Sequence, residues 1–309
     1  MEIFLPAREP FRFDLALKYL KRSHDEVLDV VHGDRYRRAM QGPDGPVLVE
    51  ATTAEAGVTA RVLAGTLPEE TLACQIQRQF QLDYDRTQLP ADDPFAGPLV
   101  EQFQGLPVVQ TATPFEAMVW AILGQQINIA FAYKLKRRFV ENYGEQVDHD
   151  GHTYYLFPTP DRIVMIDTDD LREIQFSRQK TRYIVGISQA IIDGELDFEE
   201  AEQLDDEDAL ALLQKQIGIG RWTAEYVLMR GLGRRDVIPA GDMGLRSAVG
   251  VFQGLPGNAS EQAVRDLAES WRPYRGDIAF RCWFGFQHGM YKRGKQAAVV
   301  EQPADPGSY

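Results

Sequence analysis

The chain has 309 residues, and 33 Lys and Arg against 46 Asp and Glu give it a formal net charge of −13 at pH 7. Hydrophobic residues make up 44% of the chain and charged residues 26%, which is a globular composition and excludes a wholly disordered or collagen-like protein. The two cysteines, Cys74 and Cys282, exclude a disulfide framework, a four-cysteine zinc site and an iron–sulfur cluster. The length predicts about two domains.

The first residues lack the basic segment followed by an apolar segment that marks a signal peptide. No apolar run approaches the roughly 18 residues needed to span a bilayer, so we expect a cytoplasmic protein without a membrane segment. Much of the negative charge lies in ten acidic residues between positions 193 and 208, where no basic residue occurs. Such a run is typical of a solvated surface and says little about partners.

Residues 1–90 predict a small mixed domain of strands and helices. A helix is expected at residues 13–20, continuing towards residue 28, and strands at 30–40, 47–53 and 58–63, separated by Gly- and Pro-containing turns. A second helix is expected at 68–82, where Pro68 stands at an early position at which its missing N–H costs nothing.

Residues 91–98 are rich in Pro, Asp and Gly and predict a linker. From residue 99 to 294 the pattern is helical, with a long periodic segment at 114–143 and further helices at 171–174, 180–193, 206–216, 221–231, 243–252, 260–271 and 277–291. Residues 295–309 contain Pro303, Pro306 and Gly307 and predict a disordered tail. The predicted fold class is α+β, with a small N-terminal mixed α/β domain followed by an all-α domain.

The most informative segment is the turn Ile217-Gly218-Ile219-Gly220 between two predicted helices. The two glycines allow positive φ and a close backbone approach. The helix that follows presents free N–H groups and the positive end of its dipole, which favours an anion such as phosphate. The end of the preceding helix offers spare carbonyls that could hold a monovalent cation. Taken alone, such a turn is more often a plain helical hairpin with glycine caps.

The wider segment resembles the helix-hairpin-helix DNA glycosylase superfamily. The hairpin matches at Gly218, Gly220, Thr223 and Ala224, and the loop that follows matches at Pro239, Asp242, Leu245 and Arg246. Within the superfamily, residues 218–226 (GIGRWTAEY), 121–125 (AILGQ), 157–160 (FPTP) and 271–275 (WRPYR) are similar to the bacterial 3-methyladenine DNA glycosylase II (AlkA-type) family. The similarity covers roughly residues 98–287, and the N-terminal region looks more weakly like the small extra domain of that family.

This resemblance implies an all-α helix-hairpin-helix glycosylase domain that binds double-stranded DNA containing alkylated bases. It implies DNA contacts from Gly218, Ile219, Gly220, Arg221, Thr223 and Arg246, and a base pocket formed by Trp222, Tyr226 and Trp283, with Tyr19 from the first domain. An enzyme of this class must rotate the base out of the duplex, and aromatic walls suit a cationic methylated base because of stacking and cation–π attraction. A single aromatic residue of this kind is more often part of a core.

Asp242 is the predicted catalytic residue. Breaking the N-glycosidic bond builds positive charge on the sugar, as in glycoside hydrolysis, and an ionised carboxylate stabilises that charge and can orient water. Asp is also a common N-cap, and both roles can hold together because a helix N-terminus favours the ionised form. Met243 stands where some relatives have an aromatic residue.

Two positions separate this chain from relatives. Members of the superfamily that also cut the strand carry a lysine where this chain has Trp222, so we predict a monofunctional hydrolase without lyase activity. The side chain that fills the gap left by the flipped base is expected at Gln126 or Ile127, with Gln125 as another candidate. The best-known relatives have leucine at the position of Gln126, and a buried helical turn explains this segment as well.

No cofactor is expected for catalysis. The resemblance implies at most a structural Na⁺ or K⁺ on the backbone carbonyls of Gln214, Gln216 and Ile219. We expect the protein to be a monomeric enzyme that releases 3-methyladenine and 7-methylguanine in base excision repair. If it is bacterial, we expect it to be associated with the nucleoid. A glycosylase for deaminated or oxidised bases and a non-catalytic sensor of damaged DNA remain as alternatives.

Overall fold

The computed structural model describes residues 1–291. At the N-terminal end, five antiparallel strands form one sheet in the order β1-β5-β4-β3-β2. The strands are β1 (Glu2–Pro6), β2 (Val30–His32), β3 (Arg35–Gly42), β4 (Gly45–Ala54) and β5 (Gly57–Ala64). Two-residue turns join β3 to β4 and β4 to β5, so that Gly42 pairs with Gly45 and Ala54 with Gly57.

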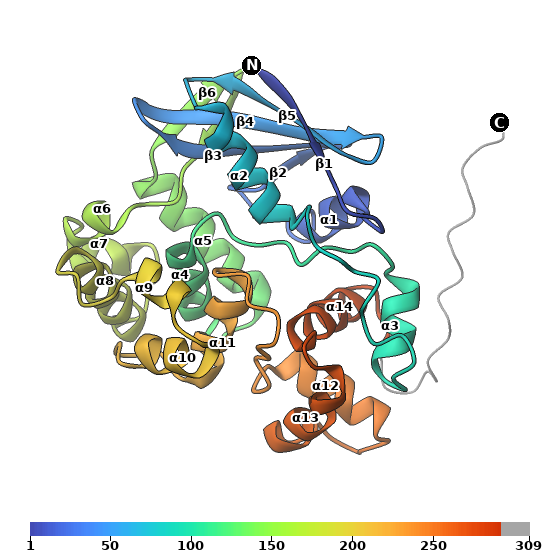
Figure 1. Cartoon of the computed structure of the whole chain (residues 1–309). Helices are drawn as coiled ribbons and strands as arrows, with labels where there is room; N and C mark the ends of the chain where they lie inside the picture. Colours follow the sequence, from blue (N-terminus) through green and yellow to red (C-terminus); the bar gives the residue numbers. More distant parts are fainter. Residues whose placement is uncertain (292–309) are drawn as a thin grey trace.

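One face of this sheet is apolar and is covered by helices α1 (Phe13–Leu20) and α2 (Glu69–Phe80), as Figure 1 shows. Because strand side chains alternate between the two faces, Tyr36, Val49 and Ala60 point towards these helices and are fully buried. The opposite face carries polar residues. It is partly covered by the hairpin of β6 (Gln146–His149) and β7 (His152–Tyr155), whose Tyr154 packs against Leu48.

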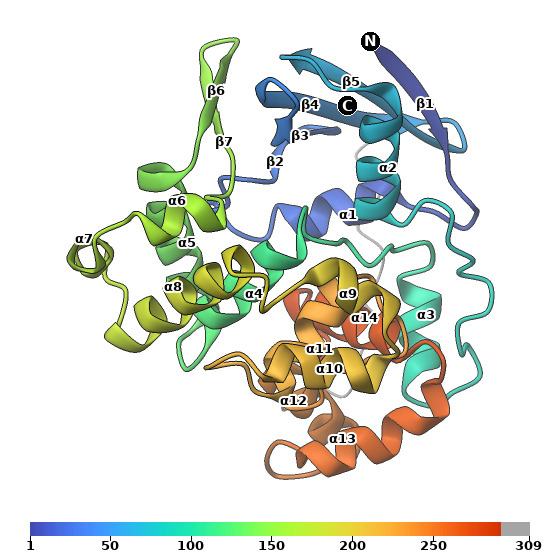
Figure 2. The same cartoon turned by 60° about the vertical axis from the view of Figure 1, so that its left-hand side comes forward.

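The rest of the described chain is helical. Its helices are α3 (Ala96–Gln102), α4 (Pro114–Gly124), α5 (Ile129–Tyr143), α6 (Pro160–Val164), α7 (Thr168–Glu173), α8 (Arg178–Ile192), α9 (Phe198–Gln203), α10 (Asp206–Gln214), α11 (Arg221–Arg230), α12 (Met243–Phe252), α13 (Glu261–Ala268) and α14 (Arg275–Gln287). Helices α4 to α11 surround one apolar core. Helices α3, α12, α13 and α14 share a second core with the N-terminal domain. Helix α1 lies between the sheet and α14 (Figure 2), and its Tyr19 ring contacts Phe280 of α14.

The α+β class is confirmed, and the strands predicted at 47–53 and 58–63 and most predicted helices are present. The single strand predicted at 30–40 is wrong, because the chain turns at residues 33–34 and forms the two antiparallel strands β2 and β3. Helix α1 ends at Leu20 and does not continue towards residue 28. The segment 114–143 is two helices, because the chain breaks at residues 125–128, where Gln126 has a φ of +59° and Asn128 caps α5. Strand β1, the β6–β7 hairpin and helix α9 were not predicted, and α3 begins inside the expected linker. The expected tail at 295–309 lies outside the described residues. Within residues 1–291, no helix has the length and hydropathy of a membrane span.

Candidate functional site

The glycine turn between α10 and α11 forms an open backbone surface. Gly218 has a φ of +86°, and a Cβ there would overlap the ring of Tyr183. A Cβ at Gly220 would meet nothing within 4 Å, so the backbone is approachable at this residue. Gly220 is the N-cap of α11 without a side-chain hydrogen bond, and the first N–H groups of a helix have no partner inside it. The arrangement can therefore bind an anion.

The predicted DNA contacts around this turn differ in accessibility. Arg221 is exposed, with its Nε 2.9 Å from Glu225 Oε1. Arg246 is half-buried, and its Nε donates to the carbonyl of Ala259. Thr223 is buried, and its hydroxyl accepts from Gln125 Nε2, so its side chain is not exposed to a bound duplex.

The loop 125–128 lies beside the glycine turn and is joined to it. Gln125 Nε2 donates to the carbonyl of Gly218 at 3.1 Å and to Thr223 Oγ1 at 3.2 Å. This side chain is therefore held against the turn and is not free to enter a duplex. Gln126 is exposed at the tip of the loop, whereas Ile127 is partly buried against the core of α4 to α11.

Asp242 is the N-cap of α12, with its Oδ1 accepting from Leu245 N at 2.9 Å. The same oxygen accepts from Trp283 Nε1, also at 2.9 Å. Burial raises the pKa of this carboxyl above the ordinary value for aspartate, while donors that include the Leu245 and Gly244 amides and Trp283 oppose the shift. The carboxylate is thus partly desolvated and fixed in orientation, and both predicted roles, N-cap and candidate reactive group, are geometrically compatible.

Three of the predicted pocket residues form a row of rings next to Asp242. The Tyr226 ring lies between those of Trp222 and Trp283, with centroid separations of 5.8 and 5.9 Å. Trp222 and Tyr226 come from α11 and Trp283 from α14, so the row bridges the two helical groups. The indole Nε1 of Trp222 is buried, and Trp222 is among the donors that favour the ionised form of Asp242.

Tyr19 extends this row towards the N-terminal domain. Its ring centroid is 4.4 Å from that of Phe280, which in turn contacts Trp283 at 6.4 Å. Tyr19 is buried, and its hydroxyl accepts from Arg230. Burial raises the pKa of the neighbouring Tyr226 to about 12, so that hydroxyl stays protonated.

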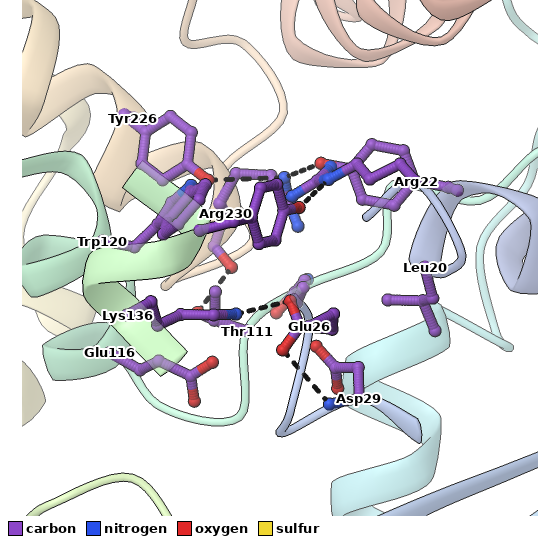
Figure 3. A pocket seen from close by; sticks show the side chains of 13 residues that line it. Leu20, Arg22, Glu26, Asp29, Thr111, Glu116, Trp120, Lys136, Tyr226 and Arg230 are labelled. Atoms are coloured by element: carbon purple, nitrogen blue, oxygen red, sulfur yellow. Dashed lines mark hydrogen bonds and ion pairs between the residues drawn. The ribbon is translucent and has the colours of Figure 1, made fainter. Parts of the chain in front are cut away.

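Two arginines lie at this inner end, and neither was singled out in the sequence. The guanidinium carbon of Arg22 is 3.9 Å from the Tyr19 ring centroid, and Arg22 Nε donates to Tyr133 Oη. Arg230 donates to Tyr19 and to the carbonyl of Val109. Within the described chain neither arginine forms an ion pair with a carboxylate. Figure 3 shows Arg230 next to Tyr226, with Arg22 on the far side of Arg230. Apart from the bond of Arg230 to Tyr226 Oη, these hydrogen bonds join residues more than a hundred positions apart, so no sequence motif marks the two arginines.

Beneath the arginines lies a small cavity of about 20 Å³, with room for about one water molecule. Its lining includes Glu26, Asp29, Glu116 and Lys136. Lys136 of α5 pairs with Glu26, and Arg38 of β3 pairs with Glu116 of α4 and with Asp29 of its own domain. Burial raises the pKa of Glu116. Burial would raise the pKa of Asp29 as well, but the charges of Arg38 and Lys136 and the hydrogen bonds from Tyr36 and Arg38 together outweigh it and hold that pKa below the ordinary value. This layer fixes the first domain against the site.

Comparison with known proteins agrees with this geometry. Residues 119–273 match the family model described as HhH-GPD superfamily base excision DNA repair protein. The chain is 34% identical over 217 residues to the DNA-3-methyladenine glycosylase of Bacillus subtilis (strain 168), covering 69% of this chain and 72% of that protein.

Two solved structures are similar to the whole fold. The 3-methyladenine DNA-glycosylase from Archaeoglobus fulgidus superposes with a TM-score of 0.80 at 29% identity, over 93% of this chain and 98% of the other. The Clostridium acetobutylicum 8-oxoguanine glycosylase/lyase in complex with double-stranded DNA superposes with a TM-score of 0.74 at 18% identity, over 94% and 98%, and shares the fold. The chain belongs to the HhH-GPD superfamily of base excision DNA repair proteins.

Proposed function

We propose that the protein is a DNA glycosylase that hydrolyses the N-glycosidic bond of alkylated bases, with 3-methyladenine and 7-methylguanine as the expected products. The observation that carries the proposal is the position of Asp242, oriented by Leu245 and Trp283 at the end of the row of aromatic rings. The names of the Bacillus subtilis relative and of the Archaeoglobus fulgidus structure support this substrate class.

The glycine turn binds the DNA backbone. The N–H groups at the start of α11 and its positive dipole end face one phosphate, and Arg221 and Arg246 add positive charge near it. The carbonyls of Gln214, Gln216 and Ile219 lie at and after the end of α10 and suit a Na⁺ or K⁺, because a carbonyl oxygen has two lone pairs, of which Gln216 uses one to accept from Ile219 N. That ion is structural, and catalysis needs no cofactor. The enzyme acts as a monomer on double-stranded DNA.

The flipped base lies along the rings of Trp222, Tyr226 and Trp283, with Tyr19 at the inner end. Its sugar lies next to Asp242. As the bond between C1′ and the base nitrogen breaks, the electron pair leaves with the base, so a cationic methylated base departs as a neutral molecule. Positive charge then develops on the sugar and is stabilised by the carboxylate. Water adds to C1′ and gives up a proton, which completes the hydrolysis.

The side chain of Gln126 fills the gap left in the duplex. Its exposure and its φ of +59° support this assignment, since a strained residue held at a tip often serves function. Replacement by glycine removes the plug and also relieves the left-handed conformation, which costs a non-glycine residue about 1–2 kcal/mol. We expect Gln126→Gly to lower base release from duplex DNA about tenfold without loss of thermal stability, and Gln126→Leu to retain it. Equal rates for wild type and Gln126→Gly would contradict the assignment.

The reaction stops at the abasic site, because Trp222 stands where a lyase needs an amine that can form a Schiff base with the sugar. Borohydride trapping on methylated duplex DNA is the measurement. We expect no covalent protein–DNA adduct and no strand cleavage before alkali treatment. The 8-oxoguanine glycosylase/lyase of Clostridium acetobutylicum, whose name states lyase activity, serves as the positive control on its own substrate. A trapped adduct would show that another lysine performs this step.

The central experiment measures the free bases that the protein releases from duplex DNA treated with a methylating agent, without added metal or cofactor. Release of 3-methyladenine and 7-methylguanine supports the proposal. Release of a deaminated or oxidised base from a panel of damaged duplexes would shift the substrate class. Tight, lesion-dependent binding with no product would favour a damage sensor.

A further inference from the structure

The loop that carries Gln126 is fixed by a buried lysine from a different helix. Lys180, in the first turn of α8, is 8% exposed. Its Nζ lies 2.7 Å from the carbonyl oxygen of Ile122, 2.9 Å from that of Leu123 and 2.9 Å from that of Gln125. These carbonyls belong to the end of α4 and the first residue of the loop, where a helix leaves its acceptors without partners. A cation is favoured there because it faces the negative end of the helix dipole.

The same loop is fixed at two further points. The Gln125 side chain donates to Gly218 and Thr223 of the glycine turn, and the Asn128 side chain accepts from Phe131 N at the start of α5. Tyr183, one turn after Lys180 on α8, lies against Gly218. The loop, α8 and the glycine turn therefore form one connected block of hydrogen bonds and contacts.

From this arrangement we infer that Lys180 is a positioning residue that holds Gln126 in the orientation needed to enter the duplex, and that Gln125 couples this orientation to the binding of phosphate by the glycine turn. The inference rests on the proposed function. It assigns neither residue a contact with the reacting atoms. One of the three bonded carbonyls belongs to Gln125, directly before Gln126, so its release lets the strained residue relax to an ordinary backbone conformation.

Lys180 can donate to all three carbonyls only when its amine is protonated. An ammonium group has three N–H donors, whereas a neutral amine has two, so deprotonation releases at least one of the three carbonyls. Burial lowers the pKa of Lys180 to about 8. The groups facing Nζ from α4 and the loop are carbonyls, and no charged side chain of the described chain contributes to this shift. The loop is therefore expected to loosen as the pH rises through about 8.

The test compares duplex and single-stranded methylated DNA, because a plug is needed only where a base must leave a stack. We expect Lys180→Met to lower kcat/KM on the duplex at least about tenfold, in line with loss of charge-assisted hydrogen bonds. On single-stranded DNA its kcat/KM should stay within about twofold of the wild-type value. Gln125→Leu is expected to act in the same direction. Arg182→Met, which removes an exposed cation from the same helix, is the matched control and should change the ratio of the two rates little.

Lys180→Arg provides a second measurement, since arginine stays charged at all relevant pH values. The wild-type preference for duplex should fall above about pH 8, and the fall should be absent in Lys180→Arg. Equal losses on both DNA forms would mean that Lys180 supports only the fold, and an unchanged ratio in Lys180→Met would overturn the inference. Failure of the wild type to release any base would instead refute the proposed function, so the two failures are distinguishable.

Discussion

Replacement of Asp242 by asparagine is expected to lower base release by about 10²–10³-fold, the usual effect of removing one preorganised electrostatic group from a reaction centre. Asparagine keeps an oxygen that can accept from Leu245 and Trp283, so the cap of α12 is expected to remain. The substitution removes the negative charge that stabilises the positive charge developing on the sugar. Single-turnover release of methylated bases, with DNA affinity measured in parallel, checks this prediction.

Stability measurements separate loss of chemistry from loss of structure in this variant. Because burial raises the pKa of Asp242, the folded protein binds this proton more tightly than the unfolded chain does. The resulting stabilisation of the folded protein is fully present at pH values below the pKa of Asp242 in the unfolded chain. It is lost as the pH rises through the pKa of Asp242 in the folded protein. At neutral pH the ionised group is therefore a cost, and Asp242→Asn should be at least as stable as the wild type. Near-wild-type activity in Asp242→Asn would refute its assignment as the catalytic residue.

The pH dependence of the wild type follows from the same shift. The ionised carboxylate is the active form, so activity should fall with decreasing pH at values above the ordinary pKa of aspartate. Trp283→Phe removes a donor that stabilises the ionised form. We expect this variant to move the acid limb of the pH–rate profile to higher pH.

Replacement of Arg38 by methionine is expected to lower the free energy of unfolding by about 3–5 kcal/mol, because it leaves two buried carboxylates without their cation. Arg38 is 2% exposed. Its Nη1 lies 2.6 Å from Asp29 Oδ1, and its Nη2 donates to Glu116. Urea unfolding, followed by a probe of tertiary structure, gives the change in free energy and in its midpoint.

Arg61→Met is the matched control for this prediction. Arg61 is half-exposed and pairs with Glu50. Glu50 has a second partner, Arg37, whose Nε lies 2.7 Å from Glu50 Oε2 and remains in the variant. Exposed or partly exposed pairs contribute about 0–1 kcal/mol, so this variant should be nearly as stable as the wild type. The deficit of Arg38→Met should shrink as the pH falls, because burial raises the pKa of Glu116 and its protonation removes one uncompensated charge. Equal losses for the two variants would contradict the importance of the buried network.

The sequence by itself determined those features that depend on neighbouring residues. The periodicity of α8, α11, α12 and α14 and the turns between β3, β4 and β5 are local signals, and the structure has them close to their predicted positions. The turn at Gly218 and Gly220 could be recognised because positive φ and close approach restrict the residue type. Asp242 could be placed at the start of α12 because an N-cap side chain accepts a hydrogen bond from a backbone N–H two or three residues later, which is a local interaction.

Tertiary structure alone decided how these parts meet. The break between α4 and α5 is invisible in the hydrophobic pattern, because it is stabilised by Lys180, 55 residues after Gln125. The β6–β7 hairpin forms where Tyr154 can pack on Leu48 of the sheet. The inner end of the candidate pocket joins Arg230 to Tyr19 across 211 residues. Hydrogen bonds and ion pairs of this kind are set by the packing of distant elements, and no local propensity encodes them.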